Sequence, residues 1–197
     1  MTSTPRVLIV DDEPALLDLY ELWLADLDVT VVRAGCGAEA LDRCDEGVDV
    51  MMLDRHMPRV SGDEVLAELR DRSFSPRVAF VSAAIPDVRI VDLDIDAYLT
   101  KPVERDAYLD LVQSLLRRET VPETVDRYLS NLSKRAALLE TESRSVLRND
   151  QTYADLEAEL SELATRIDPH HLDDPLLRRA STDGGRADDL LPFGPDA

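Results

Sequence analysis

Five polar residues stand at or just after the ends of short apolar runs: Asp11, Asp12, Asp54, Ser82 and Lys101. Three carboxylates brought together would repel one another and raise one another's pKa. A divalent cation relieves that repulsion, and hard carboxylate oxygens with room for water suit Mg²⁺. If these residues meet in the fold, they therefore predict a magnesium site with a metal set of Asp11, Asp12 and Asp54.

The other two residues suit a phosphoryl group. Lys101 supplies a compact positive charge that can pair with phosphoryl oxygens. The hydroxyl of Ser82 can donate a hydrogen bond to the same group. A carboxylate, a metal, a lysine and a hydroxyl are together the parts needed to transfer a phosphoryl group onto an aspartate.

These residues need elements that bring them to one edge. Short apolar runs, rich in β-branched residues, predict five buried strands: Arg6–Val10, Val29–Val32, Val48–Leu53, Arg77–Val81 and Ala97–Leu99. Amphipathic stretches between them predict helices at about 14–27, 37–46, 62–72 and 103–118, with a shorter one near 86–92. This alternation predicts an α/β fold, a flavodoxin-like doubly wound five-stranded parallel sheet. Such sheets bind ligands at the carboxyl ends of their strands, where all five polar residues stand.

Four motifs occur in order at those strand ends: Leu8–Glu13, Leu53–Pro58 followed by Gly62, Val81–Ala83, and Tyr98–Pro102. With them, the chain from about Val7 to Arg118 resembles the receiver domain of two-component response regulators. Four such motifs in order form a specific signal, whereas an isolated acidic pair would be a weak one. The resemblance implies a phosphoacceptor switch that lacks any other enzymatic activity.

The resemblance also implies a role for each residue. Asp54 would accept a phosphoryl group from a phosphohistidine of a sensor histidine kinase. Asp12, Asp54 and the backbone carbonyl of His56 would ligate Mg²⁺ directly, and Asp11 would hold a metal-bound water. Lys101 would pair with the phosphoryl oxygens. The His56 side chain would either affect hydrolysis of the acyl phosphate or be a solvated loop residue.

The remaining implied roles concern switching. Ser82 would move toward the phosphoryl group, and Tyr98 would turn inward behind it. A cis peptide bond between Lys101 and Pro102 is expected as well. One departure stands out, because the stretch from Ser82 to Lys101 is shorter than in most receivers and contains Pro86. The helix near 86–92, which is the fourth in chain order, is therefore expected to be short or irregular. Receivers commonly form dimers through their fourth and fifth helices, and this departure weakens the case for such a dimer here.

After Pro122 the pattern changes to a heptad seam. Its positions are Val125, Leu129, Leu132, Ala136, Leu139, Ser143 and Val146, and it resumes at Tyr153, Leu156, Leu160, Leu163 and Ile167. The seam predicts two helices, roughly 122–147 and 152–168. They could close into an α-helical hairpin, or form one long helix in a coiled coil with a second chain. The stretch Asp126–Asp168 resembles the HalX domain that follows receivers in halophilic archaea.

These boundaries predict three parts: a receiver at 5–119, a HalX-like helical domain at 122–168 and an acidic tail at 169–197. The tail is expected to be disordered, because it is rich in proline and poor in apolar residues. The sequence lacks a bilayer-length apolar run and a signal-peptide pattern, so a cytoplasmic location without membrane association is expected.

Composition bears on partners and on salt. Among 197 residues, 41 are Asp or Glu and 22 are Lys or Arg, giving a net charge of −19 and a pI near 4.4. This charge opposes binding to nucleic acid and to anionic membranes. Lys101 and Lys134 are the only lysines. An acidic, lysine-poor chain is typical of a halophile, and an acidic mesophilic protein is the alternative.

Two functions are compatible with these patterns. The first is a phosphorelay response regulator whose phosphorylation on Asp54 switches a C-terminal helical interaction module toward an unknown downstream protein target. The alternative is a transcription regulator that contacts DNA through the helical module as a homodimer. DNA binding would use a modest basic strip of Arg135, Arg144 and Arg148, although the same arginines also fit a solvated helix face.

Overall fold

The computed structural model describes residues 4–72, 76–118 and 121–167. The chain forms two compact units. Among the described residues, the first unit holds those up to Ile85 together with Ala97–Leu116. The second holds Pro86–Asp96 together with those from Arg117 onward. The second unit therefore includes a segment that the sequence places in the middle of the receiver.

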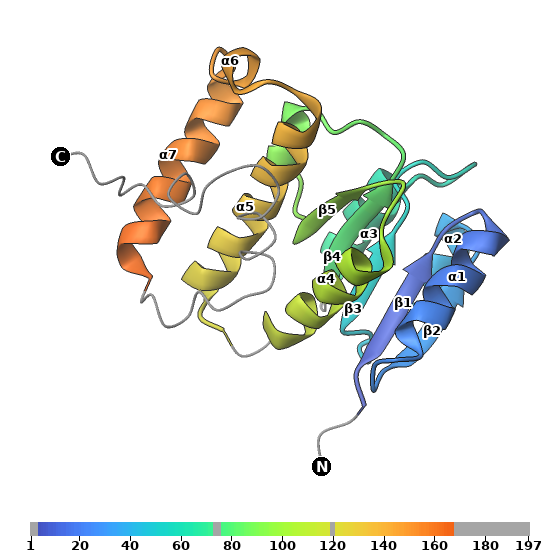
Figure 1. Ribbon diagram of the computed structural model, residues 1–197. Helices are drawn as coiled ribbons and strands as arrows, with labels where there is room; N and C mark the ends of the chain where they lie inside the picture. The colour runs from blue at the N-terminus through green and yellow to red at the C-terminus, as the bar shows by residue number, and fades with distance from the viewer. Residues whose placement is uncertain (1–3, 73–75, 119–120, 168–197) are drawn as a thin grey trace. The chain divides into compact units, whose positions relative to one another are not determined.

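The first unit is built on a five-stranded parallel sheet in the order β2-β1-β3-β4-β5 (Figure 1). The strands are β1 Arg6–Val10, β2 Thr30–Ala34, β3 Val50–Leu53, β4 Arg77–Ser82 and β5 Ala97–Thr100. The central strands β1, β3 and β4 are almost entirely buried, because helices cover both faces and apolar residues fill consecutive positions. The predicted doubly wound fold is confirmed, and each predicted strand is found within two residues at either end.

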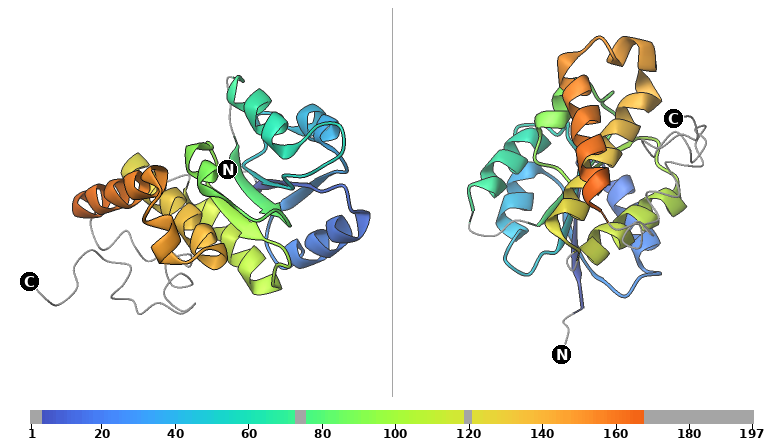
Figure 2. Two further views of the ribbon diagram at one scale, coloured as in Figure 1. Left: turned by 90° about the horizontal axis from the view of Figure 1, so that it is seen from above. Right: turned by 90° about the vertical axis from the view of Figure 1, so that its left-hand side faces the viewer.

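Helices cover both faces of the sheet (Figure 2). They are α1 Pro14–Leu24, α2 Gly37–Arg43, α3 Gly62–Arg70 and α4 Arg105–Arg117. Helices α2 and α3 pack together on one face. On the other face, Tyr20 of α1 stacks on Tyr108 of α4 with ring centroids 4.5 Å apart.

The start of α3 shows how local sequence fixes the loop that follows β3. Ser61 and Glu64 form a reciprocal capping box, with the Ser61 hydroxyl accepting from the Glu64 backbone N–H. Gly62 lies so close to the chain that a Cβ there would be 2.5 Å from the Asp54 carbonyl oxygen. Glycine is therefore required at this position for α3 to approach the carboxyl end of β3.

The segment between β4 and β5 differs from a regular α-helix. It contains one 3₁₀ helix, η1 Val88–Asp92, in which Ile90 is fully buried. Asp87 caps η1 by accepting a hydrogen bond from the Arg89 backbone N–H. The expectation of a short or irregular fourth helix is confirmed.

The second unit contains three further helices, α5 Glu123–Thr141, α6 Arg144–Leu147 and α7 Gln151–Arg166. Helices α5 and α7 pack against each other within one chain and run in opposite directions, joined through α6 (Figure 1). Asp150 caps α7 by accepting hydrogen bonds from two backbone N–H groups. Of the two arrangements left open by the sequence, the structure has the intramolecular hairpin.

The predicted seam is right for α7 and partly wrong before it. All five seam residues from Tyr153 to Ile167 are buried. On α5, however, Ala136 and Leu139 are only half-buried, and beyond it Val146 is 55% exposed. The buried face of α5 instead includes Ala137 and Leu138 together with charged residues.

Arg135 is one of those charged residues and is not part of a surface strip. Its side chain is buried, and its Nε donates to Glu157 Oε1 at 2.7 Å. The Tyr153 hydroxyl donates to the same carboxylate oxygen at 2.6 Å. The predicted basic strip therefore loses Arg135, because its charge is used inside the hairpin.

The predicted tail at 169–197 lies outside the described residues. Within the described part of the chain, no helix has both the length and the hydropathy needed to cross a bilayer.

The net charge of −19 gives the first testable prediction. Compaction concentrates this charge, so the folded chain repels itself at low salt. The melting temperature is expected to rise between about 0.1 M and about 2 M KCl, because the Debye length falls from about 10 Å at 0.1 M to about 3 Å at 1 M. Screening of surface ion pairs opposes this rise only weakly, since each contributes about 0–1 kcal/mol. Thermal melts in a KCl series measure the effect, and a flat or falling melting temperature would contradict it.

Candidate functional site

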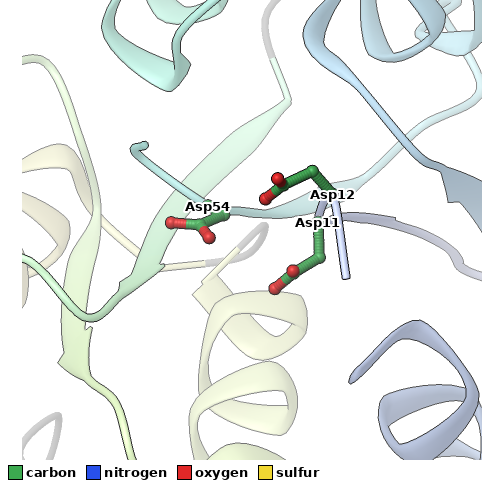
Figure 3. Close-up of side chains that lie close together, drawn as sticks. All are labelled: Asp11, Asp12 and Asp54. Atoms are coloured by element: carbon green, nitrogen blue, oxygen red, sulfur yellow. The ribbon is translucent and has the colours of Figure 1, made fainter. Parts of the chain in front are cut away.

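Three carboxylates gather at the carboxyl edge of the sheet (Figure 3). Asp11 and Asp12 follow β1, and Asp54 follows β3. Each offers an oxygen that lies within 4.8 Å of the others. Asp11 and Asp54 are buried, at 1% and 7% exposure, whereas Asp12 is exposed. Solvent therefore reaches the cluster at Asp12.

Lys101, just after β5, faces this cluster. Its Nζ donates to Asp11 Oδ2 at 2.7 Å and to Asp54 Oδ2 at 2.8 Å. Burial disfavours the charged form of Lys101, but the hydrogen bonds to Asp11 and Asp54 outweigh it, so the pKa of the ammonium is raised. One positive charge thus stands against three carboxylates, and an uncompensated negative charge remains.

Burial acts in the opposite sense on Asp11. It raises the pKa of the Asp11 carboxyl, although hydrogen bonds from Lys101 and from the Glu13 backbone N–H act against the shift. A raised carboxyl pKa means that the ionised form is poorly solvated in the fold. Crowded hard oxygen donors with this excess of negative charge fit a divalent cation, and Asp11, Asp12 and Asp54 could hold one.

The backbone after Asp54 also contributes. The His56 backbone N–H donates to Asp54 Oδ1 at 3.2 Å, while the His56 side chain is exposed. With Lys101 on Oδ2, both oxygens of Asp54 accept a hydrogen bond. The carboxylate is therefore held in one orientation. The exposed imidazole leaves open both alternatives stated for this side chain.

Ser82 and Tyr98 meet at one residue, Ala84. Ser82 ends β4 and is fully buried, and its Oγ accepts a hydrogen bond from the Ala84 backbone N–H at 3.3 Å. Tyr98 of β5 is also buried, and its hydroxyl donates to the Ala84 carbonyl at 2.8 Å. The structure thus brings two predicted residues together through a loop residue that the sequence did not single out.

The peptide bond between Lys101 and Pro102 is cis, as expected from the resemblance. The Lys101 backbone N–H donates to the Ser82 carbonyl at 2.9 Å. This bond continues the pairing of β4 with β5 beyond the strand ends, and it places Lys101 next to Ser82.

Arg55 is a site neighbour that the sequence analysis missed. Its Nε donates to Asp63 Oδ2 at 2.9 Å, and its guanidinium lies 5.8 Å from the centre of the Phe80 ring. The Phe80 and Tyr98 rings meet edge to face at 6.1 Å. Burial raises the pKa of the Tyr98 hydroxyl, and the nearby Arg55 charge partly opposes this. Adjacency to Asp54 was the only available signal for Arg55, and it does not predict these partners.

Comparisons with known proteins agree with this geometry. The family model of the response regulator receiver domain matches residues 7–113, and that of the HalX domain matches residues 117–178. A candidate transcriptional regulator of Haloferax volcanii is 42% identical over 156 residues, covering 78% of this chain and 26% of the relative. The transcriptional regulatory protein GlrR of Escherichia coli K12 is 32% identical, covering 68% of this chain and 31% of the relative. The chain thus spans less than a third of the length of these two relatives.

A solved structure gives the same result for the first unit. The CheY-like receiver domain of Methanospirillum hungatei matches with a TM-score of 0.56 and 26% identity. The match covers 59% of this chain and 97% of that domain. The order of the strands, the acidic cluster at their carboxyl edge and the family models all agree. This chain belongs to the response regulator receiver family and carries a HalX domain after its receiver domain.

Proposed function

We propose that this protein is a phosphorelay response regulator in which Asp54 accepts a phosphoryl group from a phosphohistidine of a sensor histidine kinase. The observation that carries the proposal is the Lys101 ammonium, bonded to both Asp11 and Asp54 beside a third carboxylate. In this proposal the receiver spans 5–119 and the helical domain 122–168.

The transfer exchanges one bond to phosphorus for another. An Asp54 oxygen attacks the phosphorus, the P–N bond to the kinase imidazole breaks, and an acyl phosphate forms. Asp11, Asp12, Asp54 and the backbone carbonyl of His56 would hold Mg²⁺, which supplies charge neutralisation at the phosphoryl oxygens. The hydrogen bonds to both Asp54 oxygens hold the nucleophile in position for this attack.

Lys101 and Ser82 would detect the product. Phosphorylation places new negative charge next to the Lys101 ammonium, so the lysine transfers its hydrogen bonds from the carboxylates to the phosphoryl oxygens. The Ser82 hydroxyl would donate to the phosphoryl group, and Tyr98 would follow as the loop at Ala84 adjusts. The existing contacts of both hydroxyls with Ala84 support this coupling.

The output proposed for the switch is a contact between the helical domain and a downstream protein. The proposed location of the response regulator is the cytoplasm. A second candidate is favoured by one finding, because relatives of this chain are named as transcriptional regulators. In that case the domain would contact DNA, as a homodimer. Retention on DNA across a salt series separates the two, because DNA binding must weaken steeply as salt rises.

Incubation with a small phosphodonor and Mg²⁺ tests the proposed function. The intact protein is expected to gain the mass of one phosphoryl group, in a bond that is stable in acid and labile in base. Chelating the metal should prevent the gain, because the transferred charge is then not neutralised. A protein that gains no phosphoryl group, or gains one equally well in the presence of a chelator, would contradict the proposal.

Magnesium is also expected to stabilise the folded protein, because it binds a cluster that exists only in the folded state. A hundredfold excess over the dissociation constant would add about 2.7 kcal/mol to the free energy of unfolding. Thermal melts at a constant high KCl concentration measure this effect apart from screening. It should saturate at millimolar Mg²⁺.

Two variants test whether the magnesium effect arises at the cluster, one within it and one outside it as a control. Asp12→Asn removes a ligand oxygen with little change in shape and should abolish most of the stabilisation. Asp42→Asn removes an exposed carboxylate of α2 outside the cluster and should leave the stabilisation intact. Equal responses of the two variants to Mg²⁺ would show that the ion acts on general surface charge.

A further inference from the structure

The segment Pro86–Asp96 joins two elements of the receiver but packs within the helical unit. It begins four residues after Ser82, the last residue of β4, and ends directly before β5, which contains Tyr98. Its 3₁₀ helix η1 lies against both α5 and α7. Ser82, proposed to detect the phosphoryl group, and Tyr98, proposed to follow it, are therefore linked by a stretch of chain that packs within the helical unit.

Lys134 of α5 holds the middle of this segment. Its Nζ donates to the Val91 carbonyl at 3.0 Å and to the Leu93 carbonyl at 2.7 Å. The side chain is only 6% exposed. The Lys134 ammonium donates to backbone carbonyls in place of water. Removing this donor would leave the Val91 and Leu93 carbonyls without their hydrogen bonds from Lys134.

The electrostatic surroundings of Lys134 fit this role. Burial lowers the pKa of the ammonium, and four carboxylates counteract the shift. They are Asp92, Asp94 and Asp96 of the segment and Glu159 of α7. The lysine charge thus also offsets the negative charge of the segment it binds.

The two ends of the segment are held by other side chains of the same unit. At the start, the Thr141 hydroxyl contacts the Pro86 carbonyl at 3.5 Å. At the end, Arg118 donates from Nη1 to the Asp96 carbonyl at 3.4 Å and is almost fully buried. Lys134 and Arg118 therefore hold three backbone carbonyls of the segment. The Thr141 hydroxyl lies near a fourth, although it also donates to the Leu138 carbonyl of its own helix at 3.0 Å.

The other side of the connection is the loop at Ala84. It receives the Tyr98 hydroxyl on its carbonyl, and its N–H reaches the Ser82 hydroxyl. Only Ile85 separates Ala84 from Pro86, so a displacement of Ala84 reaches Pro86 through two peptide bonds.

We infer that Pro86–Asp96 is the element that couples phosphorylation of the receiver to the helical domain, and that Lys134 anchors it there. The coupling rests on the proposed function of Asp54. When the Ser82 hydroxyl turns to the phosphoryl group, the Ala84 N–H loses its acceptor and the loop shifts. The anchored segment then moves against α5 and α7, or carries them with it.

The choice of lysine is consistent with this role. The chain uses arginine for 20 of its 22 basic residues, and both of its lysines lie where a compact ammonium bonds two oxygen acceptors. A planar guanidinium is larger and holds its donors in a fixed fork. It therefore does not match the position of a single ammonium nitrogen that donates to both the Val91 and the Leu93 carbonyl.

Hydrogen exchange on the full-length protein tests the anchor without phosphorylation. Lys134→Met keeps the length of the side chain and removes its donors. Amides of Val88–Asp92 should then exchange at least about tenfold faster, while the β-strands keep their protection. Arg127→Met is the matched control, because it removes an exposed basic residue of α5 that pairs with Glu159 instead. Unchanged exchange of the segment in Lys134→Met would overturn the assigned anchor.

A second arm adds a small phosphodonor and Mg²⁺. The wild-type protein should show altered exchange at Ala84, in Pro86–Asp96 and in α7. In Lys134→Met, uptake of the phosphoryl group and the change at Ala84 should persist, whereas the change in α7 should fall by at least about fivefold because the central anchor of the segment is lost. A full response of α7 in Lys134→Met would overturn the coupling. Absence of phosphoryl uptake by the wild-type protein would instead overturn the proposed function, and the first arm would still decide the anchor.

A milder variant covers the case in which Lys134→Met unfolds the helical unit. Thr141→Val preserves the shape of the side chain and removes the hydroxyl, which lies 3.5 Å from the Pro86 carbonyl and donates to the Leu138 carbonyl of α5 at 3.0 Å. Faster exchange at the start of the segment with an intact hairpin would support the inference. Unchanged exchange there, with phosphorylation still fully transmitted, would count against it.

Discussion

Asp54→Asn is expected to abolish uptake of the phosphoryl group, with no gain in mass after incubation with a small phosphodonor and Mg²⁺. The amide has nearly the same shape as the carboxylate, but its oxygen is a far weaker nucleophile and it cannot form an acyl phosphate. Asp54 is 7% exposed and accepts a hydrogen bond on each oxygen, so its carboxylate is held in one orientation.

Two observations keep this result interpretable. Asp42→Asn makes the same chemical change on an exposed carboxylate of α2, and it should be phosphorylated like the wild-type protein. Asp54→Asn should itself stay folded, since Lys101 retains Asp11 as a partner. Circular dichroism checks the fold. If the folded variant still took up a phosphoryl group at the wild-type rate, another residue would be the acceptor.

The site was predictable because a parallel sheet aligns the carboxyl ends of its strands. Four strands supply Asp11, Asp54, Ser82 and Lys101. The apolar runs, and the polar, glycine and proline residues that bound them, place each of these residues at a strand end. The sheet therefore brings the acidic cluster and the lysine together, as expected.

The partners that refine the site could not be predicted in the same way. Ala84 and Arg55 carry no pattern that announces their contacts, because these depend on backbone positions in loops. The segment Pro86–Asp96 shows the limit more clearly. Its place in the sequence assigns it to the receiver, whereas its carbonyls are bonded by Lys134 and by other residues of the helical unit.

The same limit explains the error on α5. A heptad pattern counts apolar residues and treats Lys134 and Arg135 as solvent-facing. Both are buried, because carbonyls of a distant segment and the Glu157 carboxylate supply their partners. The seam on α7 has no such charged positions among its buried residues, and there the pattern was right.

Leu160→Asp is expected to unfold the helical hairpin while sparing the receiver. Leu160 lies on the buried face of α7 and is 6% exposed. Removing a buried leucine side chain costs about 2–5 kcal/mol, and burying an unpaired carboxylate adds to that cost. The total is comparable with the whole stability of a small domain. Circular dichroism should show loss of much of the helix signal.

Phosphorylation of the receiver and a substitution at an exposed seam position are the controls for this variant. Phosphoryl uptake on Asp54 should survive in Leu160→Asp, because the site is built from the first unit alone. Val146→Asp makes a similar change at a predicted seam position that the structure leaves 55% exposed, and it should be tolerated. Amides of Pro86–Asp96 should lose protection in Leu160→Asp but not in Val146→Asp, since the segment packs with α5 and α7. Equal damage from the two substitutions would mean that the heptad seam, and not the observed hairpin, describes the buried face.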